Sequence, residues 1–565
     1  MSLLRCALCW FLLVLTTLAR ADSLAVMQPL PLPGPYAVGC SNVQQDFTRV
    51  APGDDVQTYW QGNPRNGQAR YITDLLVDPA RALQLDVAVP DDRELYGDYA
   101  GTRIPYVLIV CYPTSAANTR ADYRLPNGRV VPHMQTGAAT PIFADAGTRY
   151  PVLMFSVGLG GSPLSDQTMD AISVFASYGY VVVAPFHADA RIADVRITDL
   201  ADLFFAALDF RSFIAMQALR PLTLELALDR ILALPDYATH VDAGRVGAFG
   251  GSLGGESALL LTGARLTTSL GQSSRTVLTD RRIRAVAGYV PYFGQDFYPA
   301  FGRNQDGLAG ITVPFLGISG TADTTAPVST ALAGTRRLAG SRILVALKDV
   351  PHGFDVASTN DIFTWSLLFL AAHVQDDKLA RVRIARMQRV AGGGDDATLI
   401  DYTAPSAPAA GEVIVNEFHR DANDHYFVTA DAAETAMLDA GTVLRGWTRT
   451  GFAFKAWPAG SPFGLATCRF FGTPGVGPDS HFYTNSASEC AIVRGNPAWS
   501  YEGIAFNAFP AVAADCPADR IPVTRLYNNG RGGQANHRYI TSRSEAAETV
   551  ARGWSIEGPV FCGVP

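Results

Sequence analysis

Short apolar runs alternate with amphipathic stretches through residues 22–390. Six of these runs are apolar at almost every position, which is typical of strands buried on both faces. The stretches between them have the spacing of helices that cover a sheet. The pattern predicts an α/β fold with a mostly parallel sheet and helices on both faces. Its strands are expected at residues 151–156, 180–185, 245–249, 283–289, 313–319 and 342–347.

Beyond residue 412 the chain becomes rich in aromatic residues, glycine and asparagine, and it repeats. Each repeat has a histidine-aromatic segment, a short acidic segment and a tryptophan turn. The segments begin at His425, His481 and His537, the acidic residues are Glu434, Glu489 and Glu548, and the turns begin at Trp447, Trp499 and Trp554. Three copies indicate one supersecondary unit used three times. We expect a smaller, largely β C-terminal domain with pseudo-threefold character.

The change in composition falls in a glycine- and proline-rich stretch. Residues 391–411 contain Gly392-Gly393-Gly394 and an alanine-proline run, and they are expected to be a linker. The predicted organisation is therefore an α/β domain at 22–390, the linker, and the repeat domain at 412–565. So many residues exceed what one compact core usually holds.

The first 21 residues are typical of a secretory signal. Arg5 precedes an apolar stretch at 6–18, and Ala19-Arg20-Ala21 resembles a cleavage site. The next most apolar stretch, 200–219, is interrupted by charges, so no membrane-spanning segment is expected. The sequence predicts export to the periplasm or the extracellular space.

Charge and cysteine content agree with export. The chain carries a net charge of −7, and loss of Arg5 and Arg20 with the signal gives −9 (−7 − 2). A mildly acidic protein lacks the basic surface that nucleic acid requires, so no nucleic-acid partner is expected. Six cysteines remain, and we expect the pairs Cys40–Cys111, Cys468–Cys490 and Cys516–Cys562, the last two being one of three possible connectivities for the late four. No cysteine has a histidine at zinc-finger spacing, so no metal is predicted.

One motif in the α/β domain points to chemistry. Gly250-Gly251-Ser252-Leu253-Gly254 follows a buried apolar run and precedes a helical stretch. A serine fits at the tip of a sharp strand-to-helix turn only when its neighbours are small. Ser252 is therefore the candidate nucleophile; the bland alternative is a glycine-rich helix start.

A serine nucleophile needs a base, and the base needs an acid. His352 follows the predicted strand at 342–347, and Asp323 follows the one at 313–319. These positions reproduce the chain order serine, acid, histidine. Asp296, Asp349 and Asp355 are rival acids, with Asp296 the runner-up, and His133, His187, His240 and His373 are rival bases.

Acyl transfer also needs donors to the developing oxyanion. The backbone N–H of Leu253, next to the nucleophile, is one candidate. The glycine-rich segment 157–162 follows an early strand, and the N–H of Leu159 is the other candidate. The alternative is that this segment is only a turn.

With these motifs, residues 35 to 385 resemble the α/β-hydrolase superfamily, in particular secreted platelet-activating-factor acetylhydrolases and dienelactone-hydrolase-like esterases. The stretches Pro151–Gly160 and Ala176–Pro185 carry the likeness beside the Gly-x-Ser-x-Gly motif. The resemblance implies serine hydrolysis of carboxylic esters without a cofactor. Val157 stands where that family usually has histidine, and the acetylhydrolases place their acid one strand earlier, near Asp296. The loop at Asp323 is more similar to dienelactone hydrolases and polyester-degrading esterases.

Residues 412–565 resemble an uncharacterised repeat module of exported bacterial proteins, on the His-Phe-Tyr-Thr and Trp-x-x-Glu-Gly signatures. The sequence thus predicts an exported serine esterase acting on a lipid-like, small-molecule or polyester substrate. The alternative is a non-catalytic protein whose repeats hold a glycan or polymer surface. The apolar stretch 203–208, with Phe210, is expected to be a helix on the sheet or a lid.

Overall fold

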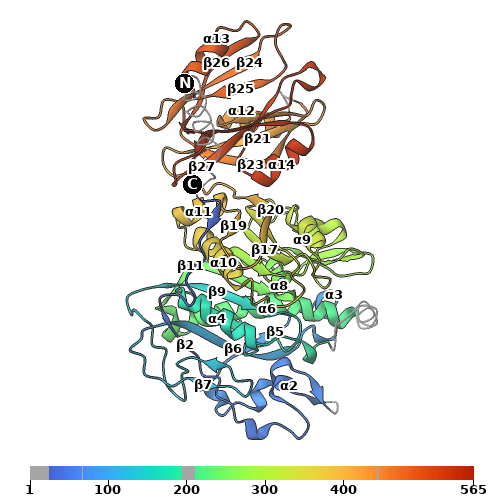
Figure 1. Ribbon diagram of the computed structural model, residues 1–565. Coiled ribbons are helices and arrows are strands. Elements are labelled where there is room, and N and C mark those ends of the chain that lie inside the picture. Colours follow the sequence, from blue (N-terminus) through green and yellow to red (C-terminus); the bar gives the residue numbers. More distant parts are fainter. Residues whose placement is uncertain (1–23, 66–67, 194–209, 442–444) are drawn as a thin grey trace, which may run out of the picture. The chain divides into compact units, whose positions relative to one another are not determined.

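The computed structural model describes residues 24–65, 68–193, 210–441 and 445–565 (Figure 1). The expected signal peptide and the apolar stretch 203–208 lie outside these residues. The chain forms two compact units. One comprises residues 30–381 and 393–404, and the other comprises the described part of 1–29 together with 382–392 and 405–565.

The first unit is built on a ten-stranded mixed sheet within the described residues. Its centre is six parallel strands in the order β10-β9-β11-β14-β17-β18. They are β9 (Tyr150–Ser156), β10 (Val181–Pro185), β11 (Val241–Gly251), β14 (Ile283–Tyr289), β17 (Phe315–Gly320) and β18 (Arg342–Leu347). All six apolar runs singled out in the sequence are therefore strands of this sheet.

Antiparallel strands extend both edges. On one side β6 (Arg103–Thr114) pairs with β10, and β2 (Ala37–Cys40) and β5 (Leu83–Ala88) pair with β6. On the other side β20 (Asp396–Tyr402) pairs with β18. The prediction of a linker at 391–411 is wrong for residues 396–402. These residues form β20 at the edge of the sheet, and Ile400 and Tyr402 are buried.

Successive residues of the central strands face opposite helix layers, as the pleat requires. On one face, Phe155 and Phe249 contact Phe175 of α4 (Asp166–Ser177), and Phe175 contacts Phe363 of α10 (Thr359–His373). On the other, Met154 and Ala248 belong to a core shared with α6 (Phe210–Ala233) and α8 (Leu253–Leu261). These residues are apolar on both faces because both faces are covered.

The second unit contains three copies of a strand-strand-helix-strand repeat. The first is β21 (Val413–Arg420), β22 (His425–Thr429), α12 (Ala432–Ala440) and β23 (Trp447–Ala456). The second is β24 (Leu465–Gly472), β25 (His481–Thr484), α13 (Ala487–Arg494) and β26 (Trp499–Pro510). The third is β27 (Ile521–Tyr527), β28 (His537–Ile540), α14 (Arg543–Ala551) and β29 (Ser555–Gly563).

The structure refines two details of the expected repeat. Each acidic segment is a helix, capped by Asp431, Ser486 or Ser542, whose side chain accepts the N–H of the residue three positions on. That third residue is Glu434, Glu489 and Glu545, so Glu545 and not Glu548 is the equivalent acid. The strand register also shows that Tyr426, and not His425, is the residue of the first repeat that is equivalent to His481 and His537. Tyr426 faces His419, whereas the two histidines face Phe471 and Tyr527 at the corresponding positions.

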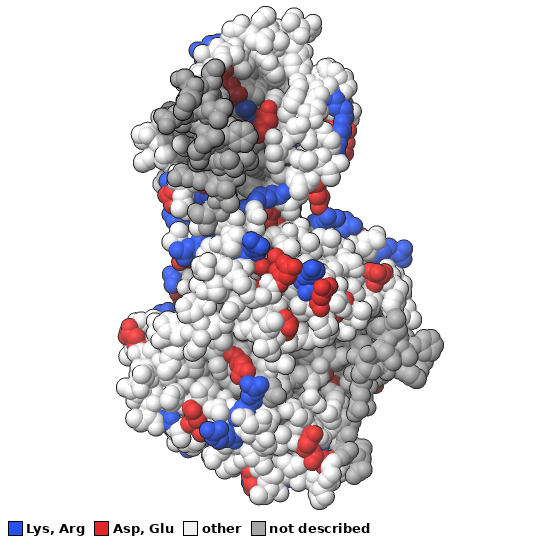
Figure 2. Space-filling view, in the orientation of Figure 1, with Lys and Arg blue, Asp and Glu red and all other residues white. Residues whose placement is uncertain are grey.

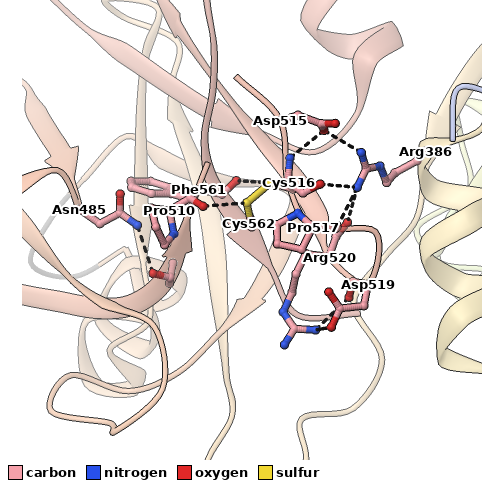
Figure 3. Close-up of a disulfide and its surroundings, with 11 residues drawn as sticks. Arg386, Asn485, Pro510, Asp515, Cys516, Pro517, Asp519, Arg520, Phe561 and Cys562 are labelled. Atoms are coloured by element: carbon pink, nitrogen blue, oxygen red, sulfur yellow. Dashed lines mark hydrogen bonds and ion pairs between the residues drawn. A yellow bond between two sulfur atoms is a disulfide. The ribbon is translucent and has the colours of Figure 1, made fainter. Parts of the chain in front are cut away.

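The three disulfides form as predicted. Cys40–Cys111 joins facing residues of β2 and β6. Cys468–Cys490 links β24 to α13, and Cys516–Cys562 closes onto β29. Figure 3 shows Arg386 beside the last bridge, where its guanidinium donates to the carbonyl oxygens of Cys516 and Pro517 and to Asp515. Arg386 is 1% exposed and ties residues 382–392 to the repeats within this unit.

Within the residues that the structure describes, none of the helices combines the length and apolar character needed to cross a bilayer.

Candidate active site

Ser252 lies in the turn between β11 and α8. Its backbone has φ 52° and ψ −121°, a region that residues with a side chain rarely occupy. The tight turn depends on absent side chains, since a Cβ on Gly254 would lie 2.0 Å from the carbonyl oxygen of Ser156. The strain presents the Ser252 hydroxyl at the carboxyl end of the parallel strands, beside the first turn of α8.

The three predicted catalytic residues, Ser252, His352 and Asp323, meet at this point. Nε2 of His352 lies 3.1 Å from Oγ of Ser252, and Nδ1 lies 2.8 Å from Oδ2 of Asp323. The other carboxylate oxygen of Asp323 accepts the backbone N–H groups of Thr325 and Ala326, each at 2.8 Å. The Asp323 side chain is fully buried, whereas the His352 side chain is 28% exposed.

In the described part of the chain, none of the rival residues is hydrogen-bonded to Ser252 or His352. Asp296 and Asp349 are exposed, and Asp355 accepts hydrogen bonds from Ser358. His133 contacts a backbone carbonyl, His240 stacks on Phe143, and His373 lies against Arg381. His187 is buried and its Nε2 lies 3.0 Å from Oγ of Ser156; burial and the neighbouring Arg220 guanidinium hold the pKa of His187 well below its usual value.

Both candidate oxyanion donors flank the serine. Gly158, next to Leu159, is close enough that a Cβ there would lie 3.4 Å from Cβ of Ser252. Leu253 begins α8, where N–H groups have no intrahelical acceptor. In the described part of the chain, neither the Leu159 nor the Leu253 N–H has a hydrogen-bond partner. The described site therefore holds two unpaired donors beside the candidate nucleophile.

A cavity of about 330 Å³ opens beside Ser252 and His352. Its wall is mostly apolar and comes from β9 and the loop after it, α4, β11, β14, α10 and the loop that carries His352. The apolar side chains are Phe155, Val157, Leu159, Ala171, Phe249, Tyr289, Val290, Phe354, Ile362 and Phe363. Among the side chains that the structure describes, this wall has no Asp, Glu, Lys or Arg, and its mostly apolar character suits an uncharged, apolar group.

Several residues that support the site were not predicted from the sequence. The Tyr289 hydroxyl donates to the carbonyl of Gly353 and accepts the Asp355 N–H, which holds the loop that carries His352. Arg220 and Asp189 form a buried ion pair under the loop at 157–160. The available signal was a lone arginine in an otherwise apolar stretch of α6. Its partner is distant in sequence, so spacing alone could not reveal it.

Across the described ranges, no three His, Cys, Asp or Glu side chains gather as a metal site would require. On the face drawn in Figure 2, basic and acidic side chains are interspersed with uncharged surface.

Comparison with known families places only the C-terminal repeats. Residues 413–564 match the profile of a domain of unknown function (DUF5648). Comparison with curated proteins gives no match. The likeness of the first unit to α/β hydrolases therefore rests on its motifs and remains an expectation.

Proposed function

We propose that the first unit is a serine hydrolase of the α/β-hydrolase class. The observation that carries the proposal is the hydrogen-bonded series from Ser252 through His352 to Asp323, beside two unpaired N–H groups. With Asp323 accepting the Nδ1 proton of His352, Nε2 is free to accept the Ser252 proton. A helix N-terminus and unpaired amides are suited to the negative charge that develops on an attacked carbonyl oxygen.

Within that class, we assign the protein to esterases that cleave neutral carboxylic esters. Ser252 Oγ attacks the ester carbonyl as His352 takes its proton. The tetrahedral oxyanion accepts the N–H groups of Leu159 and Leu253, and His352 protonates the leaving alcohol. Water then attacks the acyl-enzyme with His352 again as base, which releases the acid and regenerates Ser252.

The apolar cavity supports a substrate with an uncharged acyl or aromatic group, which includes lipid-like, small-molecule and polyester esters. The three disulfides favour an oxidising compartment, so we propose that the enzyme acts after export.

The test is hydrolysis of p-nitrophenyl esters from acetate to palmitate by the mature protein and by Ser252→Ala. We expect turnover by the parent and a loss of about 10³-fold or more in the variant. Ser177→Ala is the matched control, because this buried serine donates to a helix carbonyl and lies outside the cavity wall. A folded parent without turnover on every ester would refute the proposal.

A second candidate function belongs to the repeats. A cavity of about 270 Å³ between the first two repeats is lined by Phe427, Trp447 and Phe471 together with Arg420, Arg469, Glu434 and Glu502. Aromatic faces beside paired polar groups suit a saccharide. Binding of the full chain to immobilised polysaccharides, lost in Trp447→Ala and retained in the control Phe463→Ala at an exposed position, would support it. Equal binding by both variants would remove it.

A further inference from the structure

The loop that carries Leu159 is held from beneath by a buried ion pair. Arg220 of α6 is 2% exposed and Asp189 of the 3₁₀ turn η5 (Asp189–Arg191) is 3% exposed. The pair is bidentate: Nε donates to Oδ1 and Nη2 to Oδ2, both at 2.9 Å. This is the geometry in which a guanidinium and a carboxylate bind most specifically.

The same two side chains also bind the loop backbone. Arg220 donates from Nη1 to the Val157 carbonyl at 2.8 Å and from Nη2 to the Gly158 carbonyl at 3.0 Å. Asp189 Oδ2 accepts the Gly160 N–H at 3.0 Å. The peptide groups on both sides of Leu159 are thus fixed, and the Leu159 N–H is left unpaired in the described part of the chain.

Arg220 also reaches the helix that supplies the second donor. Its Nη1 lies 3.3 Å from Oγ of Ser257, and that hydroxyl donates to the carbonyl of Leu253 at 2.8 Å. One guanidinium therefore contacts both segments whose N–H groups flank Ser252. A buried ion pair is weak evidence for stability, since well-packed apolar residues stabilise a core equally well. Its directional contacts to two segments point to positioning instead.

We propose that Arg220 and Asp189 form a positioning clamp that fixes the Leu159 N–H relative to the Leu253 N–H as a two-donor oxyanion site. The inference rests on the proposed serine hydrolase function. Neither residue touches substrate; both act through the backbone of residues 157–160. Loss of the clamp would weaken stabilisation of the tetrahedral oxyanion more than it weakens binding of the ester.

The test variants separate geometry from charge. Arg220→Lys keeps the positive charge beside Asp189 but lacks the planar fork that reaches two carbonyls and a carboxylate together. The double variant Arg220→Gln with Asp189→Asn leaves no unpaired buried charge, so it remains informative where a single variant does not fold. For both we expect kcat to fall by about 10²-fold with KM within a few fold, after active sites are counted by burst titration.

A matched control comes from another bidentate pair in the same unit. Arg282 binds Asp280 through Nε and Nη2 and does not contact the loop at 157–160. Arg282→Gln should lower Tm and leave kcat per active site unchanged. Amide hydrogen exchange gives a readout besides activity: the segment 157–161 should exchange at least about tenfold faster in the Arg220 variants than in the parent or the control.

The outcomes are distinguishable. An inactive parent overturns the ester hydrolase proposal, and the oxyanion role of the clamp with it. An active parent whose Arg220→Lys and double variants keep the parental kcat while losing Tm overturns the clamp alone, because a merely structural pair would affect only the folded fraction. An active parent with reduced kcat, unchanged KM and faster exchange at 157–161 supports it.

Discussion

At the scale of single residues, the site depends on which proton each side chain carries. The Nδ1 atom of His352 faces a carboxylate whose second oxygen is occupied by two backbone N–H groups. In the proposed mechanism, that arrangement orients Asp323 as the acceptor and favours the tautomer of His352 that carries its proton on Nδ1. The proposed base is then Nε2, which is the atom that lies within hydrogen-bond distance of Ser252 Oγ.

Asp323→Asn should therefore lower kcat by about 10³–10⁴-fold. The new amide would turn its oxygen to the Thr325 and Ala326 N–H groups and its NH₂ to His352, which favours the wrong tautomer. Asp349→Asn is the control, because Asp349 lies on the same loop as His352 and is exposed. Ester hydrolysis by the two purified variants decides the point; equal activity would exclude Asp323 as the orienting acid.

We expect Glu256 to make the stability of the fold depend on pH. It is fully buried on α8, where it accepts a hydrogen bond from Gln217, and burial raises its pKa to about 8 from 4.5. Between these values the unfolded chain loses the proton and the folded chain keeps it. The contribution of Glu256 to the free energy of unfolding should accordingly be fully present below pH 4.5. It should decrease as pH rises toward 8, by at most about 1.4 kcal/mol per pH unit.

Glu256→Gln removes this titration. Its Tm relative to the parent should be nearly equal at pH 4.5 and higher at pH 8. Thermal unfolding of both proteins across this pH range measures the effect. A Tm difference that does not change with pH would contradict a neutral, buried Glu256.

At the scale of elements, the turn from β11 to α8 is made possible by glycines that fit no side chain. A Cβ on Gly250 would lie 2.1 Å from the backbone of Gly254, and one on Gly254 would approach Ser156 equally closely. Gly251 between them has open space. The first and last glycines of the motif thus have a packing role, and the middle one does not.

Gly254→Ala should destabilise the protein by about 3 kcal/mol or more, because the added methyl meets backbone that cannot move without displacing β9. Gly251→Ala should change stability by less than about 0.5 kcal/mol. Denaturant unfolding of the two variants compares them directly. Similar losses in both would show that the turn has more freedom than its contacts indicate.

At the scale of the whole molecule, the repeat unit closes through ion pairs between successive repeats. Arg469 binds Glu434 of the preceding helix, and Arg525 binds Glu489 in the same way. The junction between the third and the first repeat has a different arrangement of charges. Glu417 of the first repeat stands at the strand position that Arg469 and Arg525 occupy in the other two repeats. Arg538 on β28 of the third repeat binds both Glu417 and Glu545. The corresponding residues at the other junctions are Phe427 and Phe482, over which the arginines lie.

Arg538→Phe alone should cost about 3–5 kcal/mol, because Glu417 is 2% exposed and would be left without its cation. Combining it with Glu417→Arg reproduces the pattern of the other two junctions, because the introduced guanidinium would then face Glu545. The double variant should recover about 1–3 kcal/mol relative to the sum of the singles.

Calorimetry of the full chain measures this cycle. Arg449→Gln, at a partly exposed pair with Asp439, is the control and should cost less than about 1 kcal/mol. Strict additivity of the two junction substitutions would mean that the charge exchange does not restore the pattern.

The sequence by itself determined the features that depend on short-range pattern. Continuous apolar runs identified the six parallel strands, and the Gly-x-Ser-x-Gly spacing identified the turn at Ser252. Cysteine grouping paired Cys40 with Cys111, whereas the structure decided among the three connectivities of the late four cysteines. His352 and Asp323 could be proposed because each follows a strand of the same sheet, and the carboxyl ends of parallel strands converge. Catalysis by these residues remains the proposal that the Ser252 variant tests.

Only the tertiary structure decided the contacts between segments that are distant in the chain. The edge strand β20 has the glycine-rich surroundings of a linker, and only pairing with β18 and burial against the sheet make it a strand. The first repeat differs from the others by one residue of register. The sequence does not show this shift, because His425 lies at the same spacing from His481 as His481 does from His537. Arg220 meets Asp189 and the loop at 157–160 across 31 to 63 residues. Local patterning carries no information on such meetings, because packing in three dimensions selects the partners.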